Sequence, residues 1–180
     1  MRANQPCVAI LGDPIPAGLK ERLHAADIDV AQASTAGELP PFRLASILLV
    51  MVTISESVDD PKSRAAAHAM KAMLAELIEE LPPSRSVLVL IRGSESALCD
   101  RFDLKLETQL RRFQQLAAVT AGVELVINAL DVPTGADEEL LVNRLLDLIM
   151  HGEHVATGEV IHVDEIQEQS ISDALLARYL

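Results

Sequence analysis

The sequence predicts a three-layer α/β/α domain built on a parallel sheet of about six strands. Short apolar runs alternate along the chain with longer segments whose apolar residues recur at helical spacing. The runs 47–52 and 87–91 are apolar at every position, which is typical of strands buried on both faces of a parallel sheet. We therefore expect strands that are joined by right-handed crossovers.

The first part of the chain is predicted to form a strand-helix-strand unit. Its expected elements are a strand at 7–11, a turn at 12–18, a helix to about Ala26 and a strand at 28–33. Only twelve residues, 34–45, then precede the long apolar run 47–52. A helix with its own strand does not fit into that segment, so the connection between the two strands must be short.

The next element is a long helix at 61–81, which Asp60 is placed to cap and Pro82 ends. It is rich in Ala and Met, and its apolar and small residues extend around more than one stripe, so we expect a second buried face on this helix. The remaining expected elements are a strand at 87–91, a helix at 100–121, a strand at 123–127, a helix at 137–150, a strand at 160–163 and an apolar set at 171–180.

Composition excludes several classes of function. The 180 residues are 49% hydrophobic and 23% charged, which fits one globular domain spanning residues 1–180. A net charge of −12 and an aromatic content of 2% disfavour binding to nucleic acid and to anionic membranes. Two cysteines make no disulfide framework, and we find neither a signal peptide nor a membrane span, so we expect a cytoplasmic protein.

The last expected strand carries the most specific motif. The segment Thr157-Gly158-Glu159-Val160-Ile161-His162-Val163-Asp164 resembles the T-G-x-x-h-x-V-D segment that closes members of the short-chain dehydrogenase/reductase family. The helix at 100–121 and the strand after it resemble the active-site helix and following strand of that family. The first strand with Gly12 and Gly18 resembles its glycine-rich turn. The resemblance covers nearly the whole chain and implies a Rossmann-like fold.

The glycine-rich turn departs from the family pattern T-G-x-x-x-G-x-G. The resemblance keeps Gly12 and Gly18 but puts Leu11 at the Thr and Pro16 at the middle Gly. Proline has no N–H, and its ring occupies space that the cofactor pyrophosphate needs. The short segment 34–45 also omits the family strand that walls the adenine site, and Met51-Val52-Thr53-Ile54 replaces the N-N-A-G motif. We therefore expect a sheet shortened on the cofactor (adenine) side and no bound NAD(P).

The catalytic pair of the family is missing as well. The resemblance places its Tyr-x-x-x-Lys pair at Phe102 and Leu106, and neither side chain can transfer a proton or hold a nicotinamide ribose. Lys105 is one residue away, about 100° around the helix, so it does not substitute. Ser94 follows the right strand and is the one candidate remnant of the catalytic serine.

Two further clusters of side chains were weighed as ligand sites. His151, Glu153 and His154 lie close in sequence, but Gly152 interrupts them and a third ligand is missing nearby, so we expect no metal. The basic residues of the helix at 100–121 could hold an anionic ligand such as a nucleotide-bearing thioester, although a solvated helix face or salt bridges to a partner are favoured. These residues are Arg101, Lys105, Arg111 and Arg112.

The resemblance therefore implies a non-catalytic subunit with a structural role. Its partner would be a second copy or a catalytic paralogue such as a hydroxyacyl-CoA dehydrogenase of aromatic degradation, held through helices 61–81 and 100–121, with the tail 165–180 as a further interface segment. Two alternatives stay open. One is a reduced NAD(P)-dependent oxidoreductase that uses Ser94, and the other is a sensor of a nucleotide or acyl thioester at the carboxyl ends of the strands.

Overall fold

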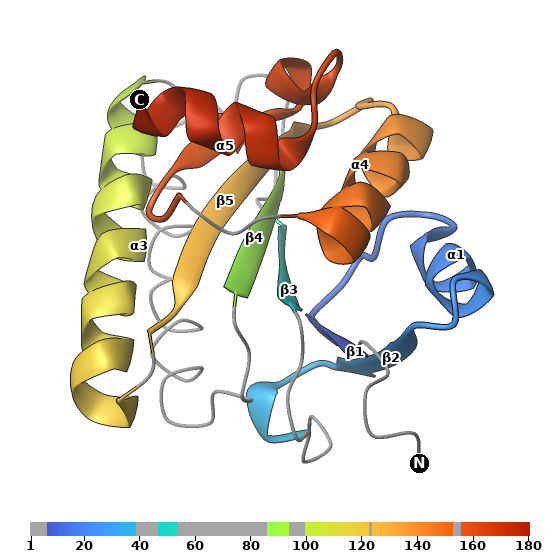
Figure 1. Ribbon diagram of the computed structural model, residues 1–180, viewed down its shortest axis with the longest axis horizontal. Helices are drawn as coiled ribbons and strands as arrows, with labels where there is room; N and C mark the ends of the chain where they lie inside the picture. Colours follow the sequence, from blue (N-terminus) through green and yellow to red (C-terminus); the bar gives the residue numbers. More distant parts are fainter. Residues whose placement is uncertain (1–6, 39–46, 54–85, 94–99, 123, 153–155) are drawn as a thin grey trace.

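The computed structural model describes residues 7–38, 47–53, 86–93, 100–122, 124–152 and 156–180 (Figure 1). They form one six-stranded sheet with every strand parallel, in the order β2-β1-β3-β4-β5-β6. The strands are β1 (Cys7–Leu11), β2 (Asp29–Ala33), β3 (Ile47–Thr53), β4 (Ser86–Gly93), β5 (Val126–Pro133) and β6 (Val160–His162). The predicted class of fold and number of strands are confirmed.

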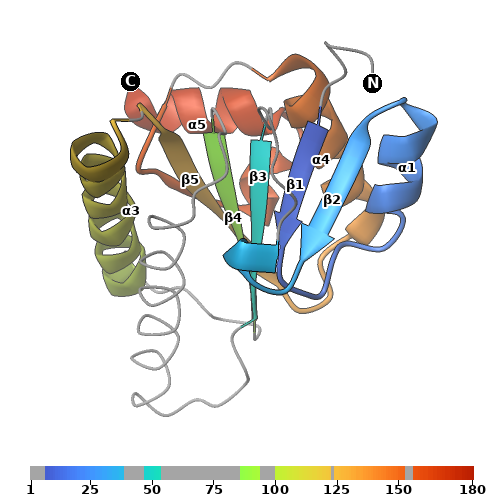
Figure 2. The same ribbon diagram turned by 90° about the horizontal axis from the view of Figure 1, so that it is seen from below.

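Helices cover both faces of this sheet. The helices are α1 (Leu19–Ala25), α3 (Asp100–Ala121), α4 (Glu138–His151) and α5 (Ile171–Tyr179), with short 3₁₀ turns η1 (Ala36–Glu38) and η2 (Val163–Ile166). One core cluster joins α1, α4 and α5 to one face, and the other joins α3 to the opposite face (Figure 2). Side chains alternate between the two clusters along each strand, as β geometry requires. The molecule therefore has three layers.

The alternation is clear on the central strands. On β3, Ile47, Leu49 and Met51 belong to the α4 side. Leu48 and Val50 on the same strand belong to the α3 side. All five are buried, which explains why this run is apolar at every position.

One crossover has an unexpected hand. The steps β4-α3-β5 and β5-α4-β6 run in the same direction across the sheet, yet α3 and α4 lie on opposite faces. The step β1-α1-β2 runs the other way with α1 on the α4 face, so it shares its hand with β4-α3-β5. Because nearly all such crossovers are right-handed, β5-α4-β6 is the exception. The prediction of right-handed crossovers throughout is wrong here, and the result is that α4 packs beside α1.

The helix at 100–121 has the predicted bounds, whereas β5 lies further along the chain than predicted. The strand pairs with all of β4, from Ser86 opposite Val126 to Gly93 opposite Pro133. Two buried polar residues, Asn128 and Asp131, interrupt the apolar pattern of β5, so the predicted strand ends too early. The strand at 160–163 ends at His162 because Val163 begins η2.

The side of the sheet at β2 is short. The strand β1 pairs directly with β2 on one side and with β3 on the other. Within the part of the chain that the structure describes, β2 is the edge strand, as the short segment at 34–45 predicted. The helix expected at 61–81 and Ser94 lie outside the described residues. Among the described helices, none combines the length and apolar character that a membrane crossing requires.

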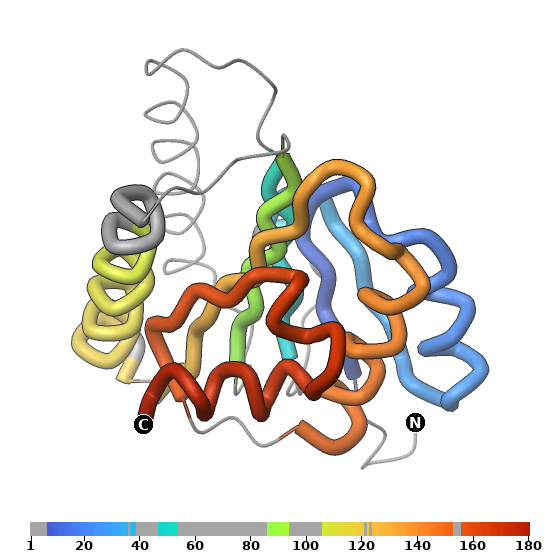
Figure 3. Tube along the Cα trace, turned by 90° about the horizontal axis from the view of Figure 1, so that it is seen from above, coloured from blue at the N-terminus to red at the C-terminus, as the bar shows by residue number. Residues whose placement is uncertain are grey.

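The tail 165–180 is part of the domain. Ile166, Ile171 and Ala174 are buried in the core on the α4 side. The last turn of α5 ends beside α3, as Figure 3 shows from above. The end of α5 therefore lies close to α3.

Candidate functional site

The chain reverses its direction of travel across the sheet between β1 and β3. From β1 it goes to β2 on one side, and it returns to β3 on the other side. In open α/β sheets, ligands bind at such a switch point, outside the carboxyl ends of the strands. The turn at 12–18 follows β1 at this place, so it is the first candidate site.

Gly12 packs tightly at the start of the turn. Its φ is +87°, and an added Cβ would lie 2.8 Å from the backbone oxygen of Met51 on β3. Its N–H donates to the carbonyl of Ala33 at 2.9 Å. Gly12 therefore lies in close contact with the ends of both neighbouring strands, and only glycine fits there.

The rest of the turn has few amides to offer a ligand. Pro16 is buried and has no N–H, and its carbonyl accepts from Leu19 N at 3.1 Å. The N–H of Ala17 donates to Glu138 Oε2 at 3.3 Å. Glu138 is the first residue of α4, so a carboxylate from a distant helix takes the amide of the turn.

Glu138 also forms an ion pair with Arg92, at the end of β4. The guanidinium of Arg92 is mostly buried, and this burial lowers the pKa of Arg92. Pairing with a carboxylate favours its charged form. The carboxylate of Glu138 thus contacts both the amide of Ala17 and the guanidinium of Arg92.

Neighbouring carboxylates add negative charge to the turn. Asp13 Oδ1 accepts from Gln32 Nε2 at 3.0 Å, and Lys20 also contacts Gln32. Thr53 Oγ1 donates to the Asp13 carbonyl at 3.4 Å. The carboxylate of Asp13, in the turn, and that of Glu138, which contacts Ala17, are therefore both at this turn.

Four contacts hold the start of α4, two within the helix and two with α1. Asp137 is the N-cap, and its Oδ1 accepts from Glu139 N at 2.9 Å and from Leu140 N at 3.1 Å. Arg22 on α1 pairs with Glu139 at 3.3 Å and contacts Asn143. The unusual hand of the last crossover makes these contacts possible, because a right-handed crossover would place α4 beside α3.

Phe102 and Leu106, the two positions singled out by the sequence resemblance, lie on α3. Leu106 is 1% exposed and packs in the core with Leu110, Phe113 and Ala117, so it faces the sheet. Phe102 lies one turn earlier in the same helix, and its side chain is outside the described residues. The described part of α3 thus presents an apolar stripe to the sheet.

A polar pair at the carboxyl ends of β5 and β6 was not predicted. His162 Nδ1 lies 3.3 Å from Asp131 Oδ2, and the two residues are cross-strand partners. Asp131 follows Ala129 by two residues, and His162 follows Val160 by two residues. Side chains two residues apart on a strand share a face, so the pair lies on the α3 face of the sheet. The sequence analysis missed the pair because the strand was expected to end before Asp131.

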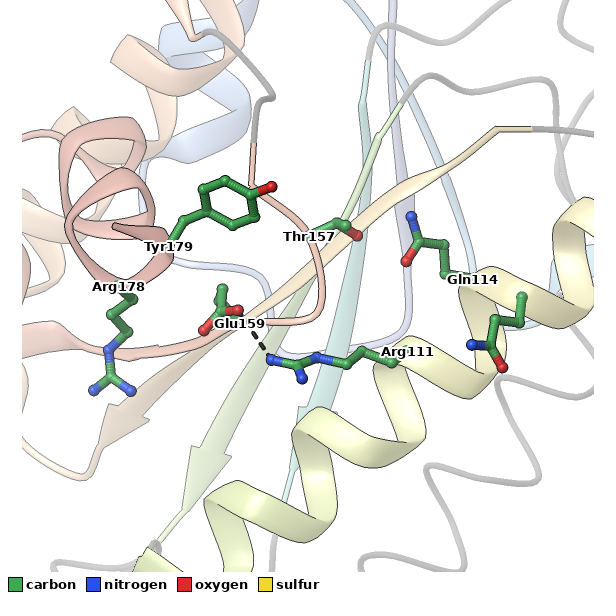
Figure 4. Close-up of a pocket in the computed structure, with 7 residues that line it drawn as sticks. Arg111, Gln114, Thr157, Glu159, Arg178 and Tyr179 are labelled. Atoms are coloured by element: carbon green, nitrogen blue, oxygen red, sulfur yellow. Dashed lines mark hydrogen bonds and ion pairs between the residues drawn. The ribbon is translucent and has the colours of Figure 1, made fainter.

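A second polar site lies between α3 and α5, beside the amino end of β6 (Figure 4). We call it the α3–α5 groove, and its volume is about 460 Å³. It is lined by Arg111, Gln114, Gln115, Thr157, Glu159, Arg178 and Tyr179. Of the predicted basic cluster, it contains Arg111, which pairs with Glu159 at 3.1 Å. This ion pair lies within the chain, so salt bridges from this helix to a partner stay a prediction.

The described residues contain no group of three metal-ligating side chains. His151 lies 3.6 Å from Asp147, its neighbour on α4, while Glu153 and His154 are outside the described residues. Comparison with protein family models, with curated proteins and with solved structures finds no match to this chain.

Proposed function

We propose that this chain is a non-catalytic subunit similar to short-chain dehydrogenase/reductase proteins, with a structural role in an oligomer. The observation that carries the proposal is the carboxylate of Glu138 at the turn. It accepts from Ala17 N at 3.3 Å and pairs with Arg92. Two groups that could bind an anion at the switch point, the Ala17 amide and the Arg92 guanidinium, are therefore used within the chain itself.

Electrostatics support this proposal. A pyrophosphate bound at the turn would have to displace Glu138 from Ala17 and Arg92 and would then lie beside the released carboxylate. Two like unit charges at 4 Å repel by about 4 kcal/mol near a protein surface. Pro16 supplies no compensating N–H, and Asp13 adds another carboxylate. Dinucleotide binding therefore has a large cost and little to offset it.

The surface supports a role in assembly. α3 exposes two large apolar side chains, Leu116 and Val119, and the exposed fraction of Val119 is 83%. At the end of the chain, Tyr179 and Leu180 are exposed as well. Clustered exposed apolar residues mark interaction surfaces. We propose that α3, together with the segment 61–81 and the end of the tail 165–180, contacts a second copy or a catalytic paralogue.

Calorimetric titration with NAD(H) and NADP(H) tests the first part of the proposal. We expect no saturable heat in the micromolar range. A micromolar dissociation constant would overturn the proposal and would favour the NAD(P)-dependent enzyme, in which the Asp131–His162 pair would be a candidate acid/base group.

Co-expression tests the second part. The partner to try first is a short-chain dehydrogenase encoded in a neighbouring reading frame, and a hydroxyacyl-CoA dehydrogenase is the class we propose. Co-elution of the two chains and a gain in the partner's activity would support a structural subunit. A Val119→Asp variant should weaken the complex, while Glu139→Gln on the α1 side is the matched control. Separate elution with no self-association would contradict the proposal.

A further inference from the structure

We propose that the α3–α5 groove binds a neutral, polyhydroxylated small molecule, a sugar or cyclic polyol. The groove is built from three elements that are far apart in the sequence: the second half of α3, the segment before β6 and the last turn of α5. Its volume of about 460 Å³ is in the range of small-molecule sites. The proposal does not rest on the proposed structural role, although Tyr179 belongs to both surfaces.

The position of Arg111 in the groove is fixed by its neighbours. Its Nη2 lies 3.1 Å from Glu159 Oε1, and Glu159 is 9% exposed. The stem of Arg111 lies across Gly158, where an added Cβ would be 2.5 Å from Arg111 Cγ. The Arg111 side chain as a whole remains 56% exposed. A donor group that is already held in place loses little entropy when a ligand binds.

Each guanidinium group of the groove already has a carboxylate partner. Arg178 forms two hydrogen bonds with Glu165, from Nε at 3.1 Å and from Nη2 at 2.8 Å. Glu107 lies 4.0 Å from Arg111 as well. Two guanidinium groups therefore face three carboxylates, Glu107, Glu159 and Glu165. An anionic ligand would meet these carboxylates, and a cationic ligand would meet the exposed guanidinium, so a neutral ligand has the lowest electrostatic cost.

The remaining lining groups offer both donors and acceptors. Gln114 and Gln115 each carry an amide that donates and accepts, whereas the Thr157 hydroxyl already bonds to the backbone of Ile127. In Figure 4 the side chains of Gln114, Thr157 and Tyr179 lie around one common space. Adjacent hydroxyls of a polyol also donate and accept together, so they match planar amide and guanidinium groups. The hydrogen-bonding groups of the groove therefore fit a polyol better than an apolar ligand.

Tyr179 adds a flat apolar surface at the mouth of the groove. Its exposed fraction is 65%, and it is the single tyrosine of a chain that has no tryptophan. A tyrosine ring combines an apolar face with a polar hydroxyl. The C–H face of a sugar ring can pack on such a ring while its hydroxyls contact the amides.

This tyrosine also makes the test direct, because tyrosine fluorescence of the full chain reports on the groove alone. The chain is titrated with glucose, maltose and myo-inositol, and with citrate and inorganic phosphate as charged comparators. We expect a saturable change of emission with a neutral probe, which calorimetry should reproduce, and weaker or no binding of the two anions.

Two variants on the same helix assign the binding site. Gln115→Ala removes a groove amide and should weaken binding of the neutral probe about tenfold, the loss of roughly 1.4 kcal/mol. Val119→Ala changes an exposed residue outside the groove and should leave binding unchanged. Circular dichroism checks that both variants are folded. Absence of saturable binding by all three neutral probes, tighter binding of an anion, or equal effects of the two variants would each overturn the proposal.

Discussion

The turn after β1 and the α3–α5 groove differ in how their polar groups are used. At the turn, the Ala17 amide and the Arg92 guanidinium both contact Glu138, a carboxylate of the same chain. In the groove, Arg111 also has a carboxylate partner, but it stays half exposed beside a cavity of about 460 Å³. The first site lies where topology places ligands, and the second lies at the opposite end of β6.

This difference teaches that topology locates a possible site, whereas the partners that its polar groups already have decide whether it can bind a ligand. A polar group that already has a charged partner must lose that partner before it can bind a ligand, so its net contribution to affinity is small. Donors that are held in place but exposed have no such cost. Binding capacity can therefore lie away from the switch point of an α/β sheet.

Two glycine substitutions should show the largest contrast between the sites. Gly12→Ala puts Cβ 2.8 Å from a backbone oxygen of β3 at a φ of +87°, and should cost about 3 kcal/mol of unfolding free energy. Gly158→Ala has a φ of +81° but meets the side chain of Arg111, which can move, so it should cost about 1–2 kcal/mol. Urea denaturation measures both. A larger loss for Gly158→Ala would contradict the tight packing described at Gly12.

The second contrast concerns the carboxylate of Glu138. Glu138→Ala leaves the mostly buried guanidinium of Arg92 without this partner and should cost about 1–2 kcal/mol of stability. Inorganic pyrophosphate should then raise the melting temperature of this variant more than that of the native chain. Glu139→Ala changes the next residue, which is exposed, and is the matched control. An equal response of the two variants to pyrophosphate would show that Glu138 does not block the turn.

The smallest effect concerns Glu165, which anchors the groove through Arg178. Burial acts to raise the pKa of Glu165, but hydrogen bonds from Arg178 and from the His162 backbone outweigh it, so the pKa is lowered overall. A lowered pKa stabilises the folded state above the unfolded pKa of about 4.3, and this contribution is lost as the pH falls through the folded value.

Glu165→Gln should therefore cost about 1 kcal/mol near neutral pH, with the difference from the native chain shrinking below about pH 4.5. Glu168→Gln, at an exposed position close by, should cost less at every pH. Denaturant titrations at several pH values measure the two differences. A constant difference for Glu165→Gln across this range would argue against the Arg178 contact.

Local patterns in the sequence predicted the sheet and most of the helices, because buried parallel strands and amphipathic helices have clear periodicities. The bounds of β5 were missed because of Asn128. This buried amide donates to the Ala156 carbonyl at 2.8 Å and accepts from Glu159 N at 3.1 Å, so it is polar for a reason that lies about 30 residues away. No window along the chain contains that information.

The two sites illustrate the same limit. Pro16 and the missing glycine indicated a poor nucleotide turn from the sequence alone. The contact between Ala17 and Glu138 joins residues that are 121 positions apart and depends on the unusual crossover of α4. The α3–α5 groove combines side chains from three elements, each of which looks like an ordinary polar surface in the sequence.

The central claim is that the carboxylate of Glu138 keeps the turn from binding a dinucleotide. Calorimetric titration of the native chain and of Glu138→Ala with NADH tests it most directly. The account predicts no saturable binding of NADH by the native chain and weak saturable binding by the Glu138→Ala variant. Micromolar binding of NADH by the native chain would contradict it.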